Sequence, residues 1–282
     1  MIDMANLQRE QIQYLANEVS ELRSIVRHLV TESPAYQQYI VETRESFEYQ
    51  WKNLSEGMHL LSDQSFQENA VLLLGQYTGF SKEWFNNKKI LDAGCGNGRW
   101  SWALCTSGAH VTAVDVSQSG VEKTREVCRA FPNFTAKQHN LLEKLGMQDQ
   151  FDLVFSYGVV HHTGNTRLAV QNLSECVRPG GYLFMMIYGE PRPEHVEDYI
   201  ELNQYTDLRR TFAGMNFTER VSYLSEEKGK EYVHGWFDAV SPSINDLYRF
   251  DEINAWLHAL GFDYARLTVQ NRNLHIIAQR VG

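Results

Sequence analysis

The sequence predicts an α/β protein built on a mostly parallel, seven-stranded sheet with helices on both faces. From Lys88 onward, short apolar segments alternate with helical segments, which is typical of parallel strands joined by crossover helices. A glycine-rich turn directly follows the first of these strands. The length of 282 residues suits one such domain with appended segments better than two full domains.

The elements of this core follow one another along the chain. Strands are expected at KKILDAG, HVTAVDV, FTAKQHN, FDLVFSYG and GYLFMMIYG, and helices at GRWSWALCTSGA, SGVEKTREVCRAF and TRLAVQNLSECV. Residues 189–245 then break this alternation, being polar and helical in places. A helix at FDEINAWLHALG and strands at DYARLTVQ and NLHIIAQRV resume it. We therefore predict a core over 46–188, a helical lid insertion over 189–245 and completion of the core by 246–282.

Residues 1–45 are predicted to form a helical arm, and the first helix of this arm ends at Ser33-Pro34. Residues 5–31 contain no Gly or Pro, and their apolar residues recur alternately three and four positions apart, at Ile12, Leu15, Val19, Leu22, Val26 and Leu29. β-branched residues at a and leucine at d favour a two-stranded parallel coiled coil, in which Glu18 and Arg23 could pair across the helices. About three heptads are marginal for an isolated coiled coil, so the stripe could instead pack on the protein's own core. The sequence is compatible with both the coiled coil and packing on the core.

Composition and charge limit the range of partners. The net charge is −9, and no Lys/Arg cluster supplies the basic face that nucleic acid requires, so nucleic acid is not an expected partner. The four cysteines are scattered and predict reduced thiols. The amino terminus lacks a signal-peptide pattern, and no apolar run approaches the roughly 20 residues that span a bilayer. We expect a cytoplasmic protein with no membrane partner.

The turn ILDAGCGNGRW places Gly94, Gly96 and Gly98 between a strand and a helix. Glycines at such a turn allow tight folding and close approach of a ligand to the backbone. The spacing is G-x-G-x-G, whereas dinucleotide sites use G-x-G-x-x-G, which argues against a nicotinamide oxidoreductase. Asp92 precedes the first glycine by two residues.

Asp115 ends the second strand, where an acid can accept hydrogen bonds from both hydroxyls of a ribose. The alternative role is an N-cap for the following helix, for which Ser117 is the better candidate. We therefore predict the ribose role for Asp115.

The segments LDAGCGNG, AVDVS, FDLVFSYGVVHH and VRPGGYLF, in this order, resemble the motifs of class I S-adenosylmethionine-dependent methyltransferases. The resemblance is to the small-molecule branch that includes ubiquinone-pathway, menaquinone-pathway and natural-product enzymes. It covers residues 85–188 well and 246–282 by pattern only. It implies a Rossmann-like fold, S-adenosylmethionine as cofactor and S-adenosylhomocysteine as product, and it leaves the acceptor open.

The resemblance also implies roles for single residues. The three loop glycines would lie under the methionine moiety and the ribose, with Asp92 at the foot of the loop. Asp115 would hold the ribose hydroxyls, and Val116 would cover one face of the adenine. Ser156 and Tyr157, at the end of the fourth strand, would line the sulfonium end.

At the adenine amino group the chain departs from the family pattern. The family usually has an acid there, whereas this chain has Asn140-Leu141. An asparagine can still accept a hydrogen bond through its side-chain carbonyl. The segment FEYQW, with Phe47, Tyr49 and Trp51, could close over the cofactor or pack in the core.

Methyl transfer from a sulfonium needs alignment of the reacting atoms more than it needs a base. A hydroxyl acceptor must also lose a proton, and the pair His161 and His162 follows the fourth strand near the expected acceptor position. The alternative is that the pair only shapes the loop. Further acceptor-binding candidates in the insertion are His195, Tyr205, His234, Trp236 and Asp238, each of which could instead be packing or surface. The His and Cys spacing predicts no metal site.

The sequence therefore predicts S-adenosylmethionine-dependent methylation of a small molecule, more at oxygen than at nitrogen or carbon. Methylation of a protein or tRNA is the alternative within the enzymes. A cofactor-binding scaffold or regulator that dimerises through the arm is the alternative outside them.

Overall fold

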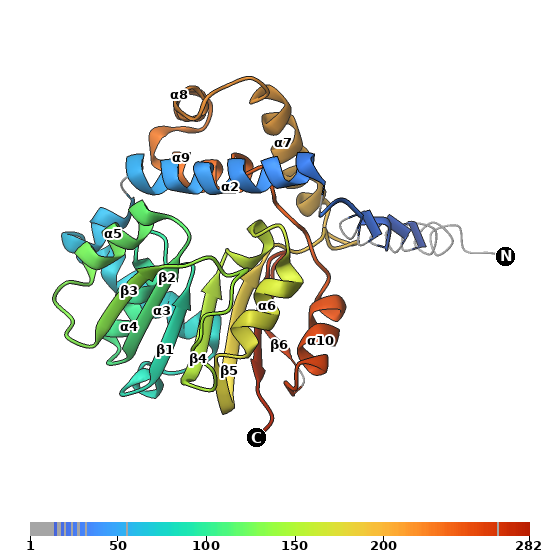
Figure 1. Cartoon of the computed structure of the whole chain (residues 1–282). Helices are drawn as coiled ribbons and strands as arrows, with labels where there is room; N and C mark the ends of the chain where they lie inside the picture. Colours follow the sequence, from blue (N-terminus) through green and yellow to red (C-terminus); the bar gives the residue numbers. More distant parts are fainter. Residues whose placement is uncertain are drawn as a thin grey trace.

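The computed structural model describes residues 14–15, 18–19, 21–23, 25–26, 29–31, 33–54, 56–263 and 265–282. Its centre is the predicted seven-stranded sheet, in the order β3-β2-β1-β4-β5-β7-β6 (Figure 1). The strands are β1 (Lys89–Ala93), β2 (His110–Asp115), β3 (Phe134–Gln138), β4 (Phe151–Tyr157), β5 (Val177–Ile187), β6 (Arg266–Val269) and β7 (Leu274–Gln279). β3, β2, β1, β4 and β5 pair in parallel, and β7 runs antiparallel to both β5 and β6. The prediction of a mostly parallel sheet is confirmed.

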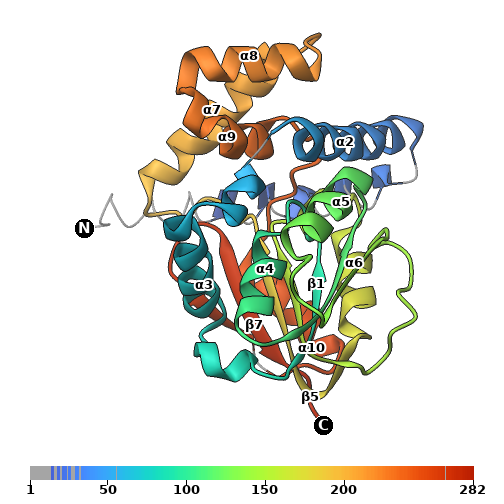
Figure 2. The same ribbon diagram turned by 90° about the vertical axis from the view of Figure 1, so that its left-hand side faces the viewer.

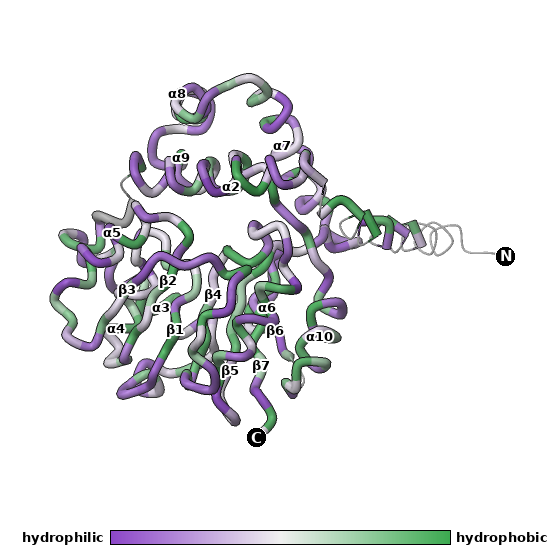
Figure 3. Tube along the Cα trace, in the orientation of Figure 1, coloured by the Kyte–Doolittle hydropathy of each residue, from purple (hydrophilic) through white to green (hydrophobic). Residues whose placement is uncertain are grey.

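Helices cover both faces of the sheet. Successive residues of a strand point to opposite faces, so neighbouring apolar residues of one strand pack against different helices. Ile90 of β1 packs in a cluster with α3 (Gln64–Thr78), α4 (Arg99–Thr106) and α5 (Gln118–Val127). Leu91, its neighbour, packs in a second cluster with α6 (Thr166–Ser174) and α10 (Phe250–Ala259). Figures 1 and 2 show the two helical layers, and Figure 3 shows hydrophobic residues concentrated along the strands between them.

The predicted insertion forms three helices, α7 (Val196–Thr211), α8 (Phe217–Lys228) and α9 (Val233–Val240), above the sheet. They enclose a small core of their own, formed by buried residues that include Leu208, Leu224 and Phe237. The short 3-10 helices are η1 (Glu56–Leu61), η2 (Lys82–Phe85), η3 (Val160–His162) and η4 (Lys230–Tyr232).

Helix α2 (Pro34–Asn53) crosses the molecule between the sheet and these three helices (Figure 1). Ser33 caps its amino end by accepting a hydrogen bond from the Tyr36 amide, and Pro34 fills the first turn, where no amide donor is needed. The Ser46 hydroxyl donates to the Ser241 hydroxyl over 3.0 Å, which ties α2 to the segment after α9.

The predicted coiled-coil segment is described only in part, and Ile12 lies outside the described residues. The described residues between 14 and 30 are helical, and the side chains of the stripe are 45–72% exposed at Leu15, Val19, Leu22, Val26 and Leu29. That exposure is too large for a stripe buried on the protein's own core. Within this chain the Arg23 guanidinium forms an ion pair with Glu190 at 3.0 Å.

In the part of the chain that the structure describes, no helix combines the length and the apolar character needed to cross a membrane. The same residues include no cluster of three or more His, Cys, Asp or Glu side chains arranged to bind a metal ion.

Candidate functional site

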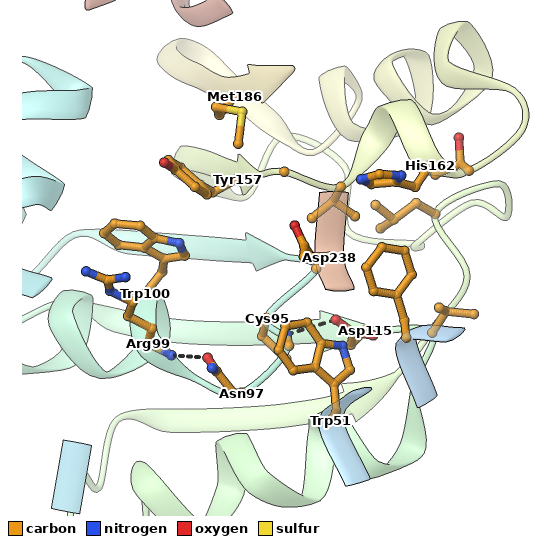
Figure 4. A pocket seen from close by; sticks show the side chains of 18 of the residues that line it. Trp51, Cys95, Asn97, Arg99, Trp100, Asp115, Tyr157, His162, Met186 and Asp238 are labelled. Carbon is orange, nitrogen blue, oxygen red and sulfur yellow. Dashed lines mark hydrogen bonds between the residues drawn. The ribbon is translucent and has the colours of Figure 1, made fainter. Parts of the chain in front are cut away.

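A cavity of about 350 Å³ opens at the carboxyl ends of β1, β2 and β4 (Figure 4). The chain adds strands to one side of β1 as far as β3 and then to the other side from β4 onward, so the boundary between β1 and β4 is a topological switch point. Ligands of open α/β sheets bind at such a point. The predicted residues that line this cavity are Gly94, Gly96, Asp115, Val116, Asn140, Leu141, Tyr157, His162, His234 and Asp238. The structure therefore brings together residues from the loop, three strand ends and the insertion.

The loop after β1 needs glycine at all three predicted positions. Gly94, Gly96 and Gly98 have φ values of 94°, 49° and 89°, in the left-handed region that other residues avoid. A β-carbon on Gly94 would lie 2.2 Å from a methyl group of Val159, and one on Gly96 would lie 2.8 Å from the Trp51 ring. Gly98 lies behind the cavity, where it forms the N-cap of α4.

Asp115 connects this loop to the end of β2. Its Oδ2 accepts the Gly96 amide and its Oδ1 accepts the Ser117 amide, both at 2.8 Å. Burial raises the pKa of the carboxyl to about 6, although these amide donors oppose the rise. Ser117 is the N-cap of α5, as its side chain accepts the Gly120 amide, so the capping role falls to Ser117 as predicted.

Asp92 lies beneath the loop, outside the cavity lining. It is fully buried, and its Oδ2 accepts a hydrogen bond from the Ser101 hydroxyl at 2.6 Å. Burial raises the pKa of Asp92 to about 7. The contact fixes the end of β1 to α4, which matches the predicted position at the foot of the loop.

Asn140 and Ser156, both predicted to contact the cofactor, form hydrogen bonds with the protein itself. The Asn140 side-chain carbonyl accepts the Leu142 amide at 3.1 Å, so only its remaining lone pair could serve an adenine amino group. Ser156 is fully buried and donates to the Ala93 carbonyl at 2.8 Å. It supports β1 and does not line the cavity, whereas its neighbour Tyr157 does.

The two adjacent histidines differ sharply in their positions. His162 lines the cavity, and its Nδ1 lies 2.7 Å from the carbonyl oxygen of Ile244. Because a carbonyl can only accept, Nδ1 carries the proton and the lone pair is on Nε2. Burial lowers the pKa of His162, and the negative charge of Asp238 opposes that effect, so the imidazole is neutral at neutral pH. His161 is fully buried between His162 and Tyr188 and lies outside the lining.

The five candidates in the insertion also separate. His234 and Asp238, on α9, line the main cavity. Tyr205 and Trp236 line a second cavity of about 630 Å³, which His234 also borders. His195 lies in neither, being 44% exposed at its side chain and paired with Glu197 at 2.6 Å.

Helix α2 supplies one wall of the cavity. Of the three aromatic residues singled out in FEYQW, Phe47 and Trp51 line the cavity, whereas Tyr49 packs against the core of the insertion. Sequence reasoning missed Thr43 and Arg44 on the same helix and Arg99 and Trp100 on α4, which also line the cavity. Thr43, Phe47 and Trp51 follow one another at intervals of four, so the helical spacing could have indicated Thr43.

Glu48, also missed, holds α2 against the start of α5. Its carboxylate accepts the Ser117 hydroxyl at 2.6 Å and the Ser119 hydroxyl at 2.5 Å. Together these donors lower the pKa of Glu48, although burial, the largest single influence, acts in the opposite direction. The first turn of α5 is therefore fastened to the helix that covers the cavity.

Comparison with known proteins agrees with this geometry. Residues 91–183 match a family described as a methyltransferase domain. The chain is 34% identical over 104 residues to the mitochondrial ubiquinone biosynthesis O-methyltransferase of Schizosaccharomyces pombe, covering 36% of this chain and 38% of that protein. It is 28% identical over 144 residues to the ubiquinone biosynthesis O-methyltransferase of Aromatoleum aromaticum, covering 44% of this chain and 61% of that protein. The chain thus spans less than two thirds of the length of these relatives.

A solved structure extends the likeness of fold beyond the matched segment. The 1,6-didemethyltoxoflavin-N1-methyltransferase of Burkholderia thailandensis, solved with S-adenosylhomocysteine, superposes with a TM-score of 0.52 at 15% identity. The superposition covers 87% of this chain and 90% of that one. The pocket fits a nucleoside cofactor, because it combines a glycine loop with a buried carboxylate, Asp115, at the end of β2. Residues 91–183 therefore resemble a methyltransferase domain, and the chain shares the fold of the solved structure over most of its length.

Proposed function

We propose that this chain transfers the methyl group of S-adenosylmethionine to an oxygen atom of a small-molecule acceptor. The observation that carries the proposal is a single cavity lined both by the glycine loop and by a neutral, buried imidazole, that of His162. The two ubiquinone-pathway O-methyltransferases named above support oxygen as the atom methylated.

In this proposal Gly94 and Gly96 would hold the methionine and ribose parts of the cofactor. Asp115 would accept the ribose hydroxyls, and Val116 and Leu141 would contact the adenine. Tyr157 would line the sulfonium end. Each of these residues borders the cavity.

The cofactor supplies an activated methyl group, so the chain must align the acceptor and exclude water. Aromatic side chains of α2, α3 and α4 form much of the wall, including Phe47, Trp51, Tyr77 and Trp100. The acceptor hydroxyl must lose its proton as the new bond forms, and His162 takes it on Nε2. The Ile244 carbonyl holds the ring in the required tautomer through Nδ1.

The proposal is tested with methyl-labelled S-adenosylmethionine and three cell fractions, namely dialysable small molecules, RNA and protein. We expect label in the small-molecule fraction, in a product that carries a methyl ether. Label in RNA or protein would contradict the acceptor class. S-adenosylhomocysteine binding without any transfer would favour a scaffold.

Replacing His162 by glutamine should lower kcat roughly a hundredfold, because a positioned base contributes about 10²–10⁴-fold. The affinity for S-adenosylhomocysteine should stay within twofold. The matched control is His161→Gln, which changes the neighbouring imidazole that does not line the cavity. Equal losses of kcat in both variants would refute the base assignment.

We further propose that residues 189–245 act as the acceptor-binding lid. His234 and Asp238 of this segment line the cavity.

We also propose that the arm, residues 1–45, dimerises the chain. The exposed stripe with valine and leucine at alternating heptad positions supports a parallel pair of helices. The intact chain should then sediment at twice its 32.6 kDa mass, and a variant lacking residues 1–31 should sediment as a monomer. An unchanged number of subunits after the deletion would exclude dimerisation through this helix.

A further inference from the structure

Asp238 is a carboxylate that the insertion places in the cavity. It lies on α9, and Figure 4 shows its side chain directed into the cavity. The Tyr188 hydroxyl donates to its Oδ2 at 3.3 Å, and the Gln50 amide donates to its Oδ1 at 3.4 Å. Both contacts are long beside the roughly 2.7–2.9 Å usual for a charged acceptor. The carboxylate therefore retains capacity for a stronger partner.

The surroundings favour a cationic partner. The cavity that Asp238 lines also has Tyr157, Met186 and Phe47 in its wall, and such side chains screen a charge less than water does. The other carboxylate in the lining, Asp115, is already held by two backbone amides at the end of β2. Asp238 is thus the carboxylate available at the end of the cavity where Tyr157 and His162 lie.

The proposed reaction moves one positive charge through this region. Before transfer the charge is on the sulfonium. As the acceptor oxygen gains the methyl group, sulfur recovers an electron pair and becomes neutral, and the hydroxyl proton passes to Nε2 of His162. Asp238 acts electrostatically on His162, since its charge favours the protonated ring. The carboxylate can therefore face a cation both before and after transfer.

We propose that Asp238 is the counter-ion of the cofactor's sulfonium, which makes the pocket select the cationic S-adenosylmethionine over the neutral-sulfur product. This inference rests on the proposed function, because it takes S-adenosylmethionine as the cofactor. Loss of the sulfonium charge removes the ion pair at the moment the product forms. Asp238 would thus speed the exchange of S-adenosylhomocysteine for fresh cofactor.

The test compares the two forms of the cofactor by calorimetry, without any acceptor. In Asp238→Asn, which keeps the shape of the side chain, the affinity for S-adenosylmethionine should fall at least tenfold. The affinity for S-adenosylhomocysteine should change less than twofold, which also shows that the variant is folded. The matched control is Asp207→Asn, which removes a carboxylate that is 73% exposed on α7 and should leave both affinities unchanged.

Two outcomes would overturn the inference. Equal weakening of both ligands would mean that Asp238 binds the amino-acid ammonium they share or only supports the pocket. No change for either ligand would mean that it faces the acceptor alone. Failure of the unmodified chain to bind S-adenosylhomocysteine would instead refute the proposed function, so the two failures can be told apart.

Discussion

Replacing Asp115 by alanine should weaken the binding of S-adenosylhomocysteine roughly tenfold to a hundredfold. A hydrogen bond to a charged group is worth about 1.5–3 kcal/mol, and a tenfold change in affinity corresponds to about 1.4 kcal/mol. The variant also removes the acceptor for the Gly96 amide, so the loop loses the contact that holds it toward the ligand. Isothermal calorimetry with purified protein measures the change directly.

The control for this variant is Glu122→Ala, which removes an exposed carboxylate from α5, the next helix along the chain. Its affinity should match that of the unmodified chain. An unchanged affinity in Asp115→Ala would show that the ribose is held elsewhere.

The same carboxylate should make binding depend on pH. Its pKa is raised to about 6, and ribose hydroxyls donate more strongly to the ionised form, so affinity is highest above pH 6 and falls as the pH drops through that value. The decline should reach about tenfold per pH unit, since one unit corresponds to about 1.36 kcal/mol. Asp115→Asn should lose this dependence. A constant affinity of the unmodified chain across this range would contradict the assignment.

Replacing Gly98 by alanine should lower the free energy of unfolding by about 2–5 kcal/mol. The left-handed backbone, with φ at 89°, costs about 1–2 kcal/mol for a residue with a β-carbon. That β-carbon would also lie 2.5 Å from a methyl group of Val127 and 3.0 Å from the Cα of Thr124, and overpacking of this kind costs about 1–3 kcal/mol. Urea denaturation followed by circular dichroism measures the loss.

Gly146 provides the matched control, because its φ is also left-handed, at 70°, while a β-carbon there would meet nothing within 4 Å. Gly146→Ala should therefore show only the backbone cost of about 1–2 kcal/mol. Equal destabilisation of the two variants would show that the contact between the loop and α5 is loose enough to absorb a methyl group.

The sheet and the glycine loop could be predicted because their signals are local. Strand segments carry their apolar runs in sequence, and the three glycines mark a turn that few other residues can adopt. The N-cap at Ser117 was predictable for the same reason, since a cap lies directly before its own helix. These features needed no knowledge of distant parts of the chain.

Other parts of the site depend on contacts between residues far apart in sequence. His161 and His162 look equivalent in the sequence, yet only His162 borders the cavity, and its tautomer is set by Ile244, 82 positions later. Asp238 meets Gln50 across 188 positions. Ser156 ends a strand as predicted, but its hydroxyl turns to the neighbouring strand instead of the ligand. Side-chain directions of this kind follow from packing.

Helix α2 has a consequence for how such proteins diversify. The matched family segment, residues 91–183, carries the loop and the strand ends, whereas α2 and α9 lie outside it and close the cavity from two other parts of the chain. Substitutions in these flanking helices at positions other than Asp238 can reshape the proposed acceptor site while the glycine loop and the strand ends stay as they are. Exchanging α2 and α9 together between homologous enzymes should therefore transfer the acceptor preference. The exchanged α2 must keep Glu48, because this residue binds the helix to the start of α5.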